Sequence, residues 1–309
     1  MSEPTPDPAE LNVERLQLLR KVGLSGSIAA AAREAAISAS AVSQQISALE
    51  REAGVPLVER MSRGVRLTGA GEMLAERARM IAAILEEARA KLDLAGGGVS
   101  GKVRVAAVAS ACAGLVSPAL RELADSKALV EVSVQSCEPS ESLALLETGR
   151  VDLAIIDEYD HVPLAVPDEL VSTPLCEDPL VAVVARSSAD DDGPTSLARL
   201  ADQAWIMPPD DAACGRAVRT ACRAQGFEPR VVWETDDMFL LTRAVELGHG
   251  IAVLPELAVA DYGHDVVRLP LRRPALRRRL QLLARKSSAS RQSVAAVAAA
   301  LAAVAKRRR

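Results

Sequence analysis

The segment AISASAVSQQISALE, Ala36–Glu50, holds the pattern that decides the fold of the amino-terminal part of the chain. Val42, Ile46 and Leu49 recur at the spacing of one apolar helix face. Ser38 is suited to cap the first turn of that helix, because a serine hydroxyl can accept a hydrogen bond from a free backbone N–H. The segment therefore predicts a short helix that buries one narrow stripe.

The opposite face of this predicted helix is polar and slim. At about 100° per residue it carries Ser40, Gln44, Ser47 and Arg51, with Ser43 on the flank. Short polar side chains let a helix enter a DNA major groove and exchange hydrogen bonds with base edges. Taken alone, the segment is equally compatible with an ordinary surface helix.

Two further helices are predicted upstream. Leu16, Leu19 and Val22 fall at helical spacing before a break at GLSGS, and Ser27 can cap the next helix. The inward face of that helix is predicted to be Ile28, Ala31, Ala32 and Ala35. These small residues allow close packing, so the three helices read as a helix-turn-helix module.

A β-hairpin is predicted directly after the module. Residues 54–71, GVPLVERMSRGVRLTGAG, alternate apolar and polar side chains around a Ser-Arg-Gly turn. Arg60, Arg63 and Arg66 are expected to cluster there. Guanidinium groups beside a helix-turn-helix can grip phosphates and so position the helix without reading sequence. Isolated arginines on a turn are otherwise simply solvated.

Residues 27–71, with SIAAAAREAAISASAVSQQISALEREAGVPLVER and RGVRLTGAG, resemble the winged helix-turn-helix of LysR-type transcriptional regulators. The resemblance implies that Ala39, Ser40, Ser43 and Gln44 face DNA. With the reasoning above, the expected DNA-binding residues are Ser27, Ser38, Ala39, Ser40, Ser43, Gln44, Ser47, Arg51, Arg60, Arg63 and Arg66.

Three positions depart from the family pattern. Ala39 replaces a frequent Gln, Ala29 a frequent Ser or Thr, and Val58 a usual Phe. The first two changes remove a candidate base contact and a candidate phosphate contact, so the resemblance implies an operator that differs from the commonest type.

One long helix is predicted over residues 72–95, with Thr68 as its cap, ending before three glycines. Its apolar stripe is Leu74, Ala78, Ile81, Leu85, Ala88 and Leu92. The stripe is too long for a small winged domain to cover. Pairing with the same helix of a second copy would bury the stripe and place two DNA-binding modules on one duplex. The resemblance also implies this pairing. The alternative is that the stripe packs onto the rest of the same chain.

Composition sets outer limits on the chain. Its 309 residues predict two or three domains. The acidic, proline-rich start MSEPTPDPAE lacks the character of a signal peptide, and no stretch of eighteen apolar residues occurs, which together predict a cytoplasmic protein. Five cysteines show no framework spacing, so reduced thiols are expected. Residues 102–265 hold 12 Lys/Arg against 28 Asp/Glu, so any DNA contact is expected from a separate module.

Beyond the glycines, short strand-like runs alternate with helix-length segments, which predicts an α/β fold with a largely parallel sheet. The resemblance implies an effector-binding domain of two subdomains, like a periplasmic solute-binding protein. The expected domains are 10–71 for the winged helix-turn-helix, 72–95 for the dimerising linker helix and 100–309 for the effector domain. Within the last, subdomain I spans about 102–173 and 278–309, and subdomain II about 174–277.

A ligand cleft is expected beyond the carboxyl ends of the strands, where helix amino ends offer free N–H groups. The expected effector-binding residues are Ser110, Cys112, Pro208, Asp210, Ala213, Thr235 and Asp236. Capping a helix is an equally good role for several of them. Cys112 and Cys214 each lie before a predicted helix, where the helix dipole favours a thiolate, so a redox-sensing switch is an alternative.

The sequence is thus interpreted as a DNA-binding transcriptional regulator that senses a small molecule and forms a dimer or a dimer of dimers. Its expected partners are double-stranded DNA and the effector, without a membrane, cofactor or metal. Common nucleotide-binding and hydrolase motifs are missing. A cytoplasmic α/β enzyme with a DNA-binding head and an architectural DNA-binding protein remain as other classes.

Overall fold

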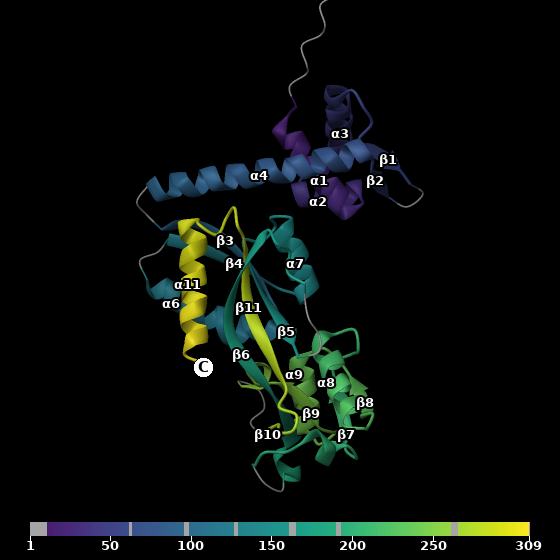
Figure 1. Ribbon diagram of the computed structural model, residues 1–309, viewed down its shortest axis with the longest axis vertical. Helices are drawn as coiled ribbons and strands as arrows, with labels where there is room; N and C mark the ends of the chain where they lie inside the picture. Colours follow the sequence, from purple (N-terminus) through teal and green to yellow (C-terminus); the bar gives the residue numbers. More distant parts are fainter. Residues whose placement is uncertain are drawn as a thin grey trace, which may run out of the picture. The chain divides into compact units, whose positions relative to one another are not determined.

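The structure is a computed structural model that describes residues 11–61, 64–95, 99–126, 129–160, 165–189, 193–260 and 265–308. The chain divides into two compact units, Met1–Gly96 and Gly97–Arg309 (Figure 1). Across the described ranges, none of the helices combines the length and apolar character needed to cross a membrane.

Three short helices open the first unit: α1 (Val13–Ser25), α2 (Ile28–Ala35) and α3 (Ala39–Ala53). Each begins at a side chain that accepts a hydrogen bond from a first-turn N–H group, which stabilises the helix start. These capping residues are Asn12, Ser27 and Ser38.

The predicted inward faces of the three helices meet in one core, which confirms the helical patterns. The buried members are Leu16, Leu19, Val22, Ala31, Ala32, Val42, Ile46 and Leu49. Ile28 and Ala35 pack at the margin of this core. The alanines of α2 let the helices approach closely, so the outer face of α3 is held on a well-packed base.

The turn between α2 and α3 contains a strained residue. Ala36 ends α2 in the left-handed region, with φ 54° and ψ 37°, where an L-residue other than glycine is disfavoured by about 1–2 kcal/mol. We expect Ala36→Gly to stabilise this turn by about 0.5–1 kcal/mol. Amide hydrogen exchange in residues 28–53 should then slow by about two- to fivefold.

A matched control for this prediction lies on the same helix. Ala29 is exposed and helical, so Ala29→Gly should cost about 1 kcal/mol and accelerate exchange. If Ala36→Gly accelerates exchange as Ala29→Gly does, the left-handed strain assigned to Ala36 is wrong.

Strands β1 (Val58–Arg60) and β2 (Val65–Leu67) form the antiparallel wing, with Glu59 opposite Arg66 and Arg60 opposite Val65. Residues directly opposite share a face, and successive residues alternate between faces. Arg60 and Arg66 therefore lie on opposite faces of the hairpin. The expected arginine cluster is wrong for this pair, because strand alternation separates them, and Arg63 lies outside the described residues.

The long helix α4 spans Gly69–Ala95. Thr68 caps it, as predicted, by accepting a hydrogen bond from the Gly71 N–H group at 3.0 Å; the helix begins at Gly69, ahead of the predicted start at Glu72. The first part of its apolar stripe is buried in the core of the unit, at Leu74 and Ala78. Farther along, Ile84, Leu85 and Leu92 are 64%, 56% and 68% exposed, so the stripe continues beyond that core.

The second unit is built on a seven-stranded sheet whose strand order is β10-β6-β11-β5-β3-β4, with β9 also paired to β6. The strands are β3 (Ser100–Ala107), β4 (Leu129–Ser136), β5 (Leu153–Tyr159), β6 (Leu170–Ala185), β9 (Ala252–Pro255), β10 (Val266–Pro270) and β11 (Arg277–Arg285). A separate parallel pair is formed by β7 (Ala204–Met207) and β8 (Arg230–Glu234).

The expectation of a largely parallel sheet is wrong. Strand β3 pairs in parallel with β4 and β5, but β11 is antiparallel to β5 and β6, and β6 is antiparallel to β9 and β10. The reason is the path of the chain: β6 leads from one subdomain into the other, and β11 returns beside it (Figure 1). A return strand next to an outgoing strand runs in the opposite direction.

Helices cover both faces of this sheet. In the first subdomain, α6 (Ser117–Asp125) and α11 (Gln292–Lys306) share a core with β3, and α7 (Pro139–Glu147) packs on the other face. In the second, α8 (Ala213–Ala224) and α9 (Met238–Glu246) pack on opposite faces of β6. The remaining helical segments are α5 (Ala109–Ala111), the π-helical turn η1 (Cys112–Val116), η2 (Arg186–Ser188), η3 (Leu197–Leu200) and α10 (Glu256–Val259). The result is a two-subdomain α/β fold.

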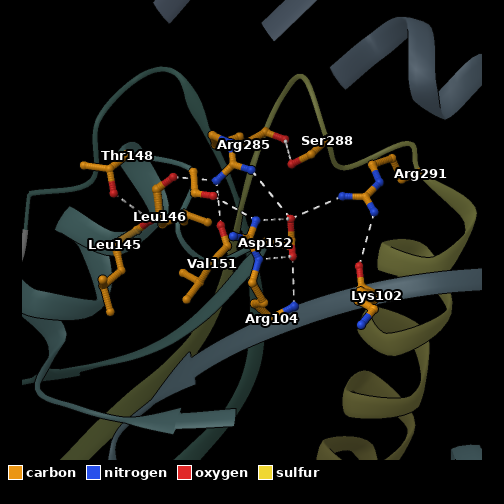
Figure 2. Close-up of polar contacts among 11 residues, drawn as sticks. Lys102, Arg104, Leu145, Leu146, Thr148, Val151, Asp152, Arg285, Ser288 and Arg291 are labelled. Carbon is orange, nitrogen blue, oxygen red and sulfur yellow. Dashed lines mark hydrogen bonds and ion pairs between the residues drawn. The ribbon is translucent and has the colours of Figure 1, made fainter. Parts of the chain in front are cut away.

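A polar cluster at the start of β5 ties the first subdomain together (Figure 2). The buried carboxylate of Asp152 accepts hydrogen bonds from the backbone N–H and the guanidinium of Arg104, at 2.8 and 3.2 Å, and from Arg291 at 3.2 Å. Arg285 adds an ion pair at 3.8 Å and donates to the carbonyls of Leu146 and Val151, both at 2.6 Å. One acid thus connects β3, β5, β11 and the start of α11.

Candidate functional site

The outer face of α3 has the geometry that the sequence predicts. Its exposed residues are Ser38, Ala39, Ser40, Gln44, Ser47 and Arg51, and Ser43 is half-buried on the flank. The apolar stripe on the opposite side of α3 is buried in the core of the unit. The helix therefore presents a continuous polar face on a fixed base.

Local hydrogen bonds distinguish the residues of this face. Ser38 caps the helix and its hydroxyl lies 2.9 Å from that of Ser40, while the Ser43 hydroxyl donates to the Ala39 carbonyl at 3.1 Å. In the described part of the chain, the Gln44 amide has no hydrogen-bond partner. Its neighbour Gln45, by contrast, accepts a bond from Arg15 at 2.8 Å. Gln44 thus has both a donor and an acceptor available to another molecule.

The other predicted DNA-binding residues have mixed surroundings. Ser27 is half-buried and accepts a hydrogen bond from the Ala30 N–H group at 3.3 Å, so it acts as a cap. Arg66 pairs with Glu59 at 2.9 Å, and this hydrogen bond raises the pKa of the exposed guanidinium. Arg60 is exposed and has no acidic partner in the described ranges. Of the two described wing arginines, Arg60 is therefore more available to a phosphate than Arg66.

A cavity of about 320 Å³ opens in the second unit. Its lining residues come from the ends of β4, β5, β7 and β8 and from the first turns of α7 and α8. They are Glu138, Pro139, Ser140, Asp157, Pro209, Asp211, Ala212, Ala213, Arg216 and Asp236. Of the predicted effector-binding residues, Ala213 and Asp236 line this cavity, which is large enough for a small organic ligand.

The other predicted effector-binding residues do not line the cavity, and most have internal roles. The Pro208 carbonyl accepts a bond from Arg219 at 2.7 Å, and the exposed Asp210 uses its carbonyl to accept one from Arg216 at 3.2 Å. Thr235 accepts a bond from the Asp237 N–H group at 3.2 Å, which is the capping alternative. Ser110 accepts a bond from Arg278 at 2.8 Å and thereby supports the wall of the cleft.

Arg278 is the central residue that the sequence analysis missed. It is buried on β11 and donates to Asp178 at 2.9 Å, to Asp157 at 2.9 Å and to Ser110. Burial opposes its charge, but Tyr159, Asp157 and Asp178 nearby raise its pKa above the ordinary value. The signal was present in the alternation of β11, because Arg278 shares a face with the buried Leu280 and Leu282.

The charged residues Glu138, Asp157 and Arg216 also line the cavity, and none of them was predicted as an effector-binding residue. Glu138 precedes α7; desolvation raises the pKa of its carboxyl group, and the neighbouring carboxylates of Asp157 and Asp236 raise it further. Like charges raise one another's pKa when they share a confined space. The cavity is thus a region of concentrated negative charge.

The expectation of an activated thiolate at Cys112 or Cys214 is wrong. Cys112 lies inside the continuous helical segment that begins at Ala109, and burial raises the pKa of its thiol. Burial also raises the pKa of Cys214 to about 12. Desolvation thus favours the protonated thiol at both positions.

Metal binding has no visible basis in the described ranges, where no group of three or more His, Cys, Asp or Glu side chains could hold an ion. The two candidate sites are a polar helix face in the first unit and an acidic cavity in the second.

Comparisons with known proteins assign both units to one family. A family model described as LysR substrate binding domain matches residues 96–306, and one described as bacterial regulatory helix-turn-helix protein, lysR family, matches residues 13–72. The small neutral protease regulatory protein of Streptomyces coelicolor is 30% identical over 278 residues, which cover 88% of this chain and 85% of that protein. The HTH-type transcriptional regulator MetR of Haemophilus influenzae is 27% identical over 265 residues, 84% of each chain.

A solved structure agrees with the fold. A full-length OxyR variant from Pseudomonas aeruginosa aligns with a TM-score of 0.71 and 20% identity, over 94% of this chain and 95% of that one. Both the resemblance in residues 27–71 and the two-subdomain expectation are thereby confirmed at the level of family and fold. The chain belongs to the LysR family of transcriptional regulators.

Proposed function

We propose that this regulator reads DNA through the exposed face of α3, with Ser40, Gln44 and Ser47 toward base edges and Arg51 toward the backbone. The observation that carries the proposal is the free amide of Gln44 on a helix whose other face is fixed in the core. An amide that donates and accepts at once can make a bidentate contact with adenine. In this proposal the helix amino ends that Ser27 and Ser38 cap lie beside the duplex, because the free backbone N–H groups of a helix amino end favour a phosphate.

We infer that α4 pairs with the same helix of a second copy. The support is the exposed part of the apolar stripe at Leu85 and Leu92, together with the adjacent exposed Ile84, which the core of the unit leaves uncovered. Burying such residues stabilises by about 1.5–3 kcal/mol each. In this proposal, residues 10–71 bind DNA, 72–95 dimerise, and 100–309 bind the effector in the acidic cavity.

Leu85→Glu tests the pairing of α4. A buried carboxylate on each subunit opposes association, so the variant is expected to shift the protein from dimer toward monomer in sedimentation at micromolar concentration. Glu76→Lys is the control, because nine residues at about 100° place Glu76 on the other side of the helix. A dimer that survives Leu85→Glu unchanged contradicts the proposed interface.

We further infer that occupancy of the cavity shifts an equilibrium between arrangements of the subunits and so changes the affinity for DNA. The regulator acts in the cytoplasm and, in this proposal, releases its ligand unchanged. Turnover of a bound ligand would assign it instead to the enzyme class.

The experiment that tests the DNA-reading function is a footprint of the full chain on the intergenic DNA beside its own gene, repeated at two salt concentrations. The expected result is protection of a partly palindromic site with two half-sites, because a dimer reads both. Weak protection spread evenly along the fragment, lost at the higher salt, is the result of phosphate attraction alone and contradicts sequence reading there.

Gln44→Ala tests the assigned base contact. Losing a bidentate contact should weaken binding to the protected site by about 1–3 kcal/mol, roughly 5- to 150-fold in Kd, and relax the preference at one base pair. The measurement is fluorescence anisotropy at fixed salt. Gln203→Ala is the matched control, since Gln203 is an exposed glutamine of the other unit, and equal affinities for both variants would remove Gln44 from the reading face.

A further inference from the structure

The cavity of the second unit has an unbalanced charge. Among the described residues, four carboxylates line it, from Glu138, Asp157, Asp211 and Asp236, against the single guanidinium of Arg216. Arg216 also donates to the backbone carbonyls of Asp210 and Asp211, at 3.2 and 3.3 Å. An anionic ligand would meet repulsion from most of this wall, whereas a cation would relieve the repulsion among the acids.

Asp157 indicates where in the cavity a cationic group would bind. Its side chain is 5% exposed, its Oδ2 atom accepts a bond from Arg278 at 2.9 Å, and its Oδ1 atom has no partner in the described part of the chain. An unsatisfied acceptor of a buried carboxylate is unfavourable unless a donor reaches it. Asp157 lines the cavity, so a ligand there can supply that donor.

The arginine behind Asp157 does not neutralise it fully. Arg278 also pairs with Asp178, at 2.7 Å. Both oxygens of Asp178 are occupied, because its Oδ1 atom accepts a bond from the Leu257 N–H group at 3.0 Å. One guanidinium is therefore shared between two buried carboxylates, which leaves one negative charge for a group that arrives from the cavity side.

We propose that the effector is a small organic cation whose ammonium or guanidinium group donates to Asp157 Oδ1, between the carboxylates of Glu138 and Asp236. The proposal rests on the cavity being the effector site. The volume of about 320 Å³ fits a short aliphatic chain. Both a diamine and a basic amino acid carry this chemistry; Arg216 offers a partner to the carboxylate of the latter.

Calorimetric titration of the full chain tests the proposal and separates the two sources. The cationic probes are 1,4-diaminobutane and L-lysine, with succinate and L-norleucine as partners of similar length that lack the terminal cation. The expected result is that at least one cationic probe binds about tenfold or more tightly than its partner, as a charged hydrogen bond is lost without it. Preference for lysine over diaminobutane identifies the amino acid class, and the reverse order identifies the diamine class.

Variants locate the binding. Asp157→Asn keeps an oxygen for Arg278 and is expected to weaken the preferred probe most, by about tenfold or more. Glu138→Gln and Asp236→Asn, which leave the Arg278 contacts intact, serve if that variant folds poorly, and each should weaken binding severalfold. Asp202→Asn removes an exposed acid that does not line the cavity and should have no effect.

Three results overturn the inference. One is tighter binding of succinate or norleucine than of the matching cation, and another is no binding of either cation at probe concentrations up to about 10 mM. The third is cation binding that the cavity variants leave unchanged. Operator binding by the same preparation separates this from the proposed function. If an anionic or neutral compound alters operator affinity while the cations do not bind, the cation inference fails and the regulator stands. If the cations bind but leave operator affinity unchanged, the ligand class stands and the regulatory role of the cavity fails.

Discussion

Replacing Arg278 with methionine is expected to destabilise the second unit by about 3–5 kcal/mol, because the buried carboxylates of Asp157 and Asp178 then lose their shared partner. Methionine preserves the length of the side chain, so lost packing contributes little. Both tryptophans, Trp205 and Trp233, lie in this unit. Their fluorescence during urea unfolding therefore reports its stability without interference from the DNA-binding unit.

The neighbouring residue on β11 provides the control for Arg278. Arg277 pairs with Glu177 at 2.7 Å, but its side chain is 46% exposed, so Arg277→Met should change the free energy of unfolding by about 0–1 kcal/mol. The two changes remove the same group from adjacent positions of one strand. Equal losses of unfolding free energy in the two variants would show that burial is not the reason why the Arg278 contacts stabilise this unit.

Asp152→Ala is expected to produce a second large loss, also about 3–5 kcal/mol, because three arginines then lose their common anion. Arg104, Arg285 and Arg291 all point at this carboxylate (Figure 2). Its side chain is 2% exposed, so water cannot readily replace the lost oxygens. Tryptophan fluorescence in urea again gives the measurement.

The opposite end of the same strand supplies the control for Asp152. Asp160 follows β5 and pairs with Arg279 at 3.2 Å, with both side chains partly exposed. Asp160→Ala should therefore cost about 0–1 kcal/mol. A loss at Asp160 as large as that at Asp152 would contradict the assignment of a central structural role to the Asp152 cluster.

The reading face of α3 could be predicted because its causes are local. The spacing of Val42, Ile46 and Leu49 sets the buried side, and rotation by about 100° per residue then gives the outer side. Capping serines mark the helix starts. That rotation already selects Gln44; the structure adds that Arg15 donates a hydrogen bond to the neighbouring Gln45.

The wing and the sheet were harder to predict because their causes are not local. The register of β1 and β2 separates Arg60 from Arg66, and nothing in the spacing of arginines encodes that register. Strand β10 and the first half of β6 likewise depend on distant segments, because β10 pairs with β6 and the first half of β6 pairs with β11.

The cleft shows the same division. Ala213 and Asp236 were found because loops after strands collect at one edge of a sheet. Asp157 looked like the ordinary end of an apolar strand, and Arg278 like the middle of three arginines in RRRLQLL. Their pairing joins residues 121 positions apart, so only the folded chain shows that they build one wall.

The most direct test of the account is the ratio of affinities of the full chain for its protected site and for a scrambled duplex of the same length and composition, at one physiological salt concentration. Reading by α3 predicts a ratio of about 10³ or more, reduced by Gln44→Ala but not by Gln203→Ala. A ratio near one, with binding that disappears as salt rises, would contradict the account and leave an architectural DNA-binding protein as the better description.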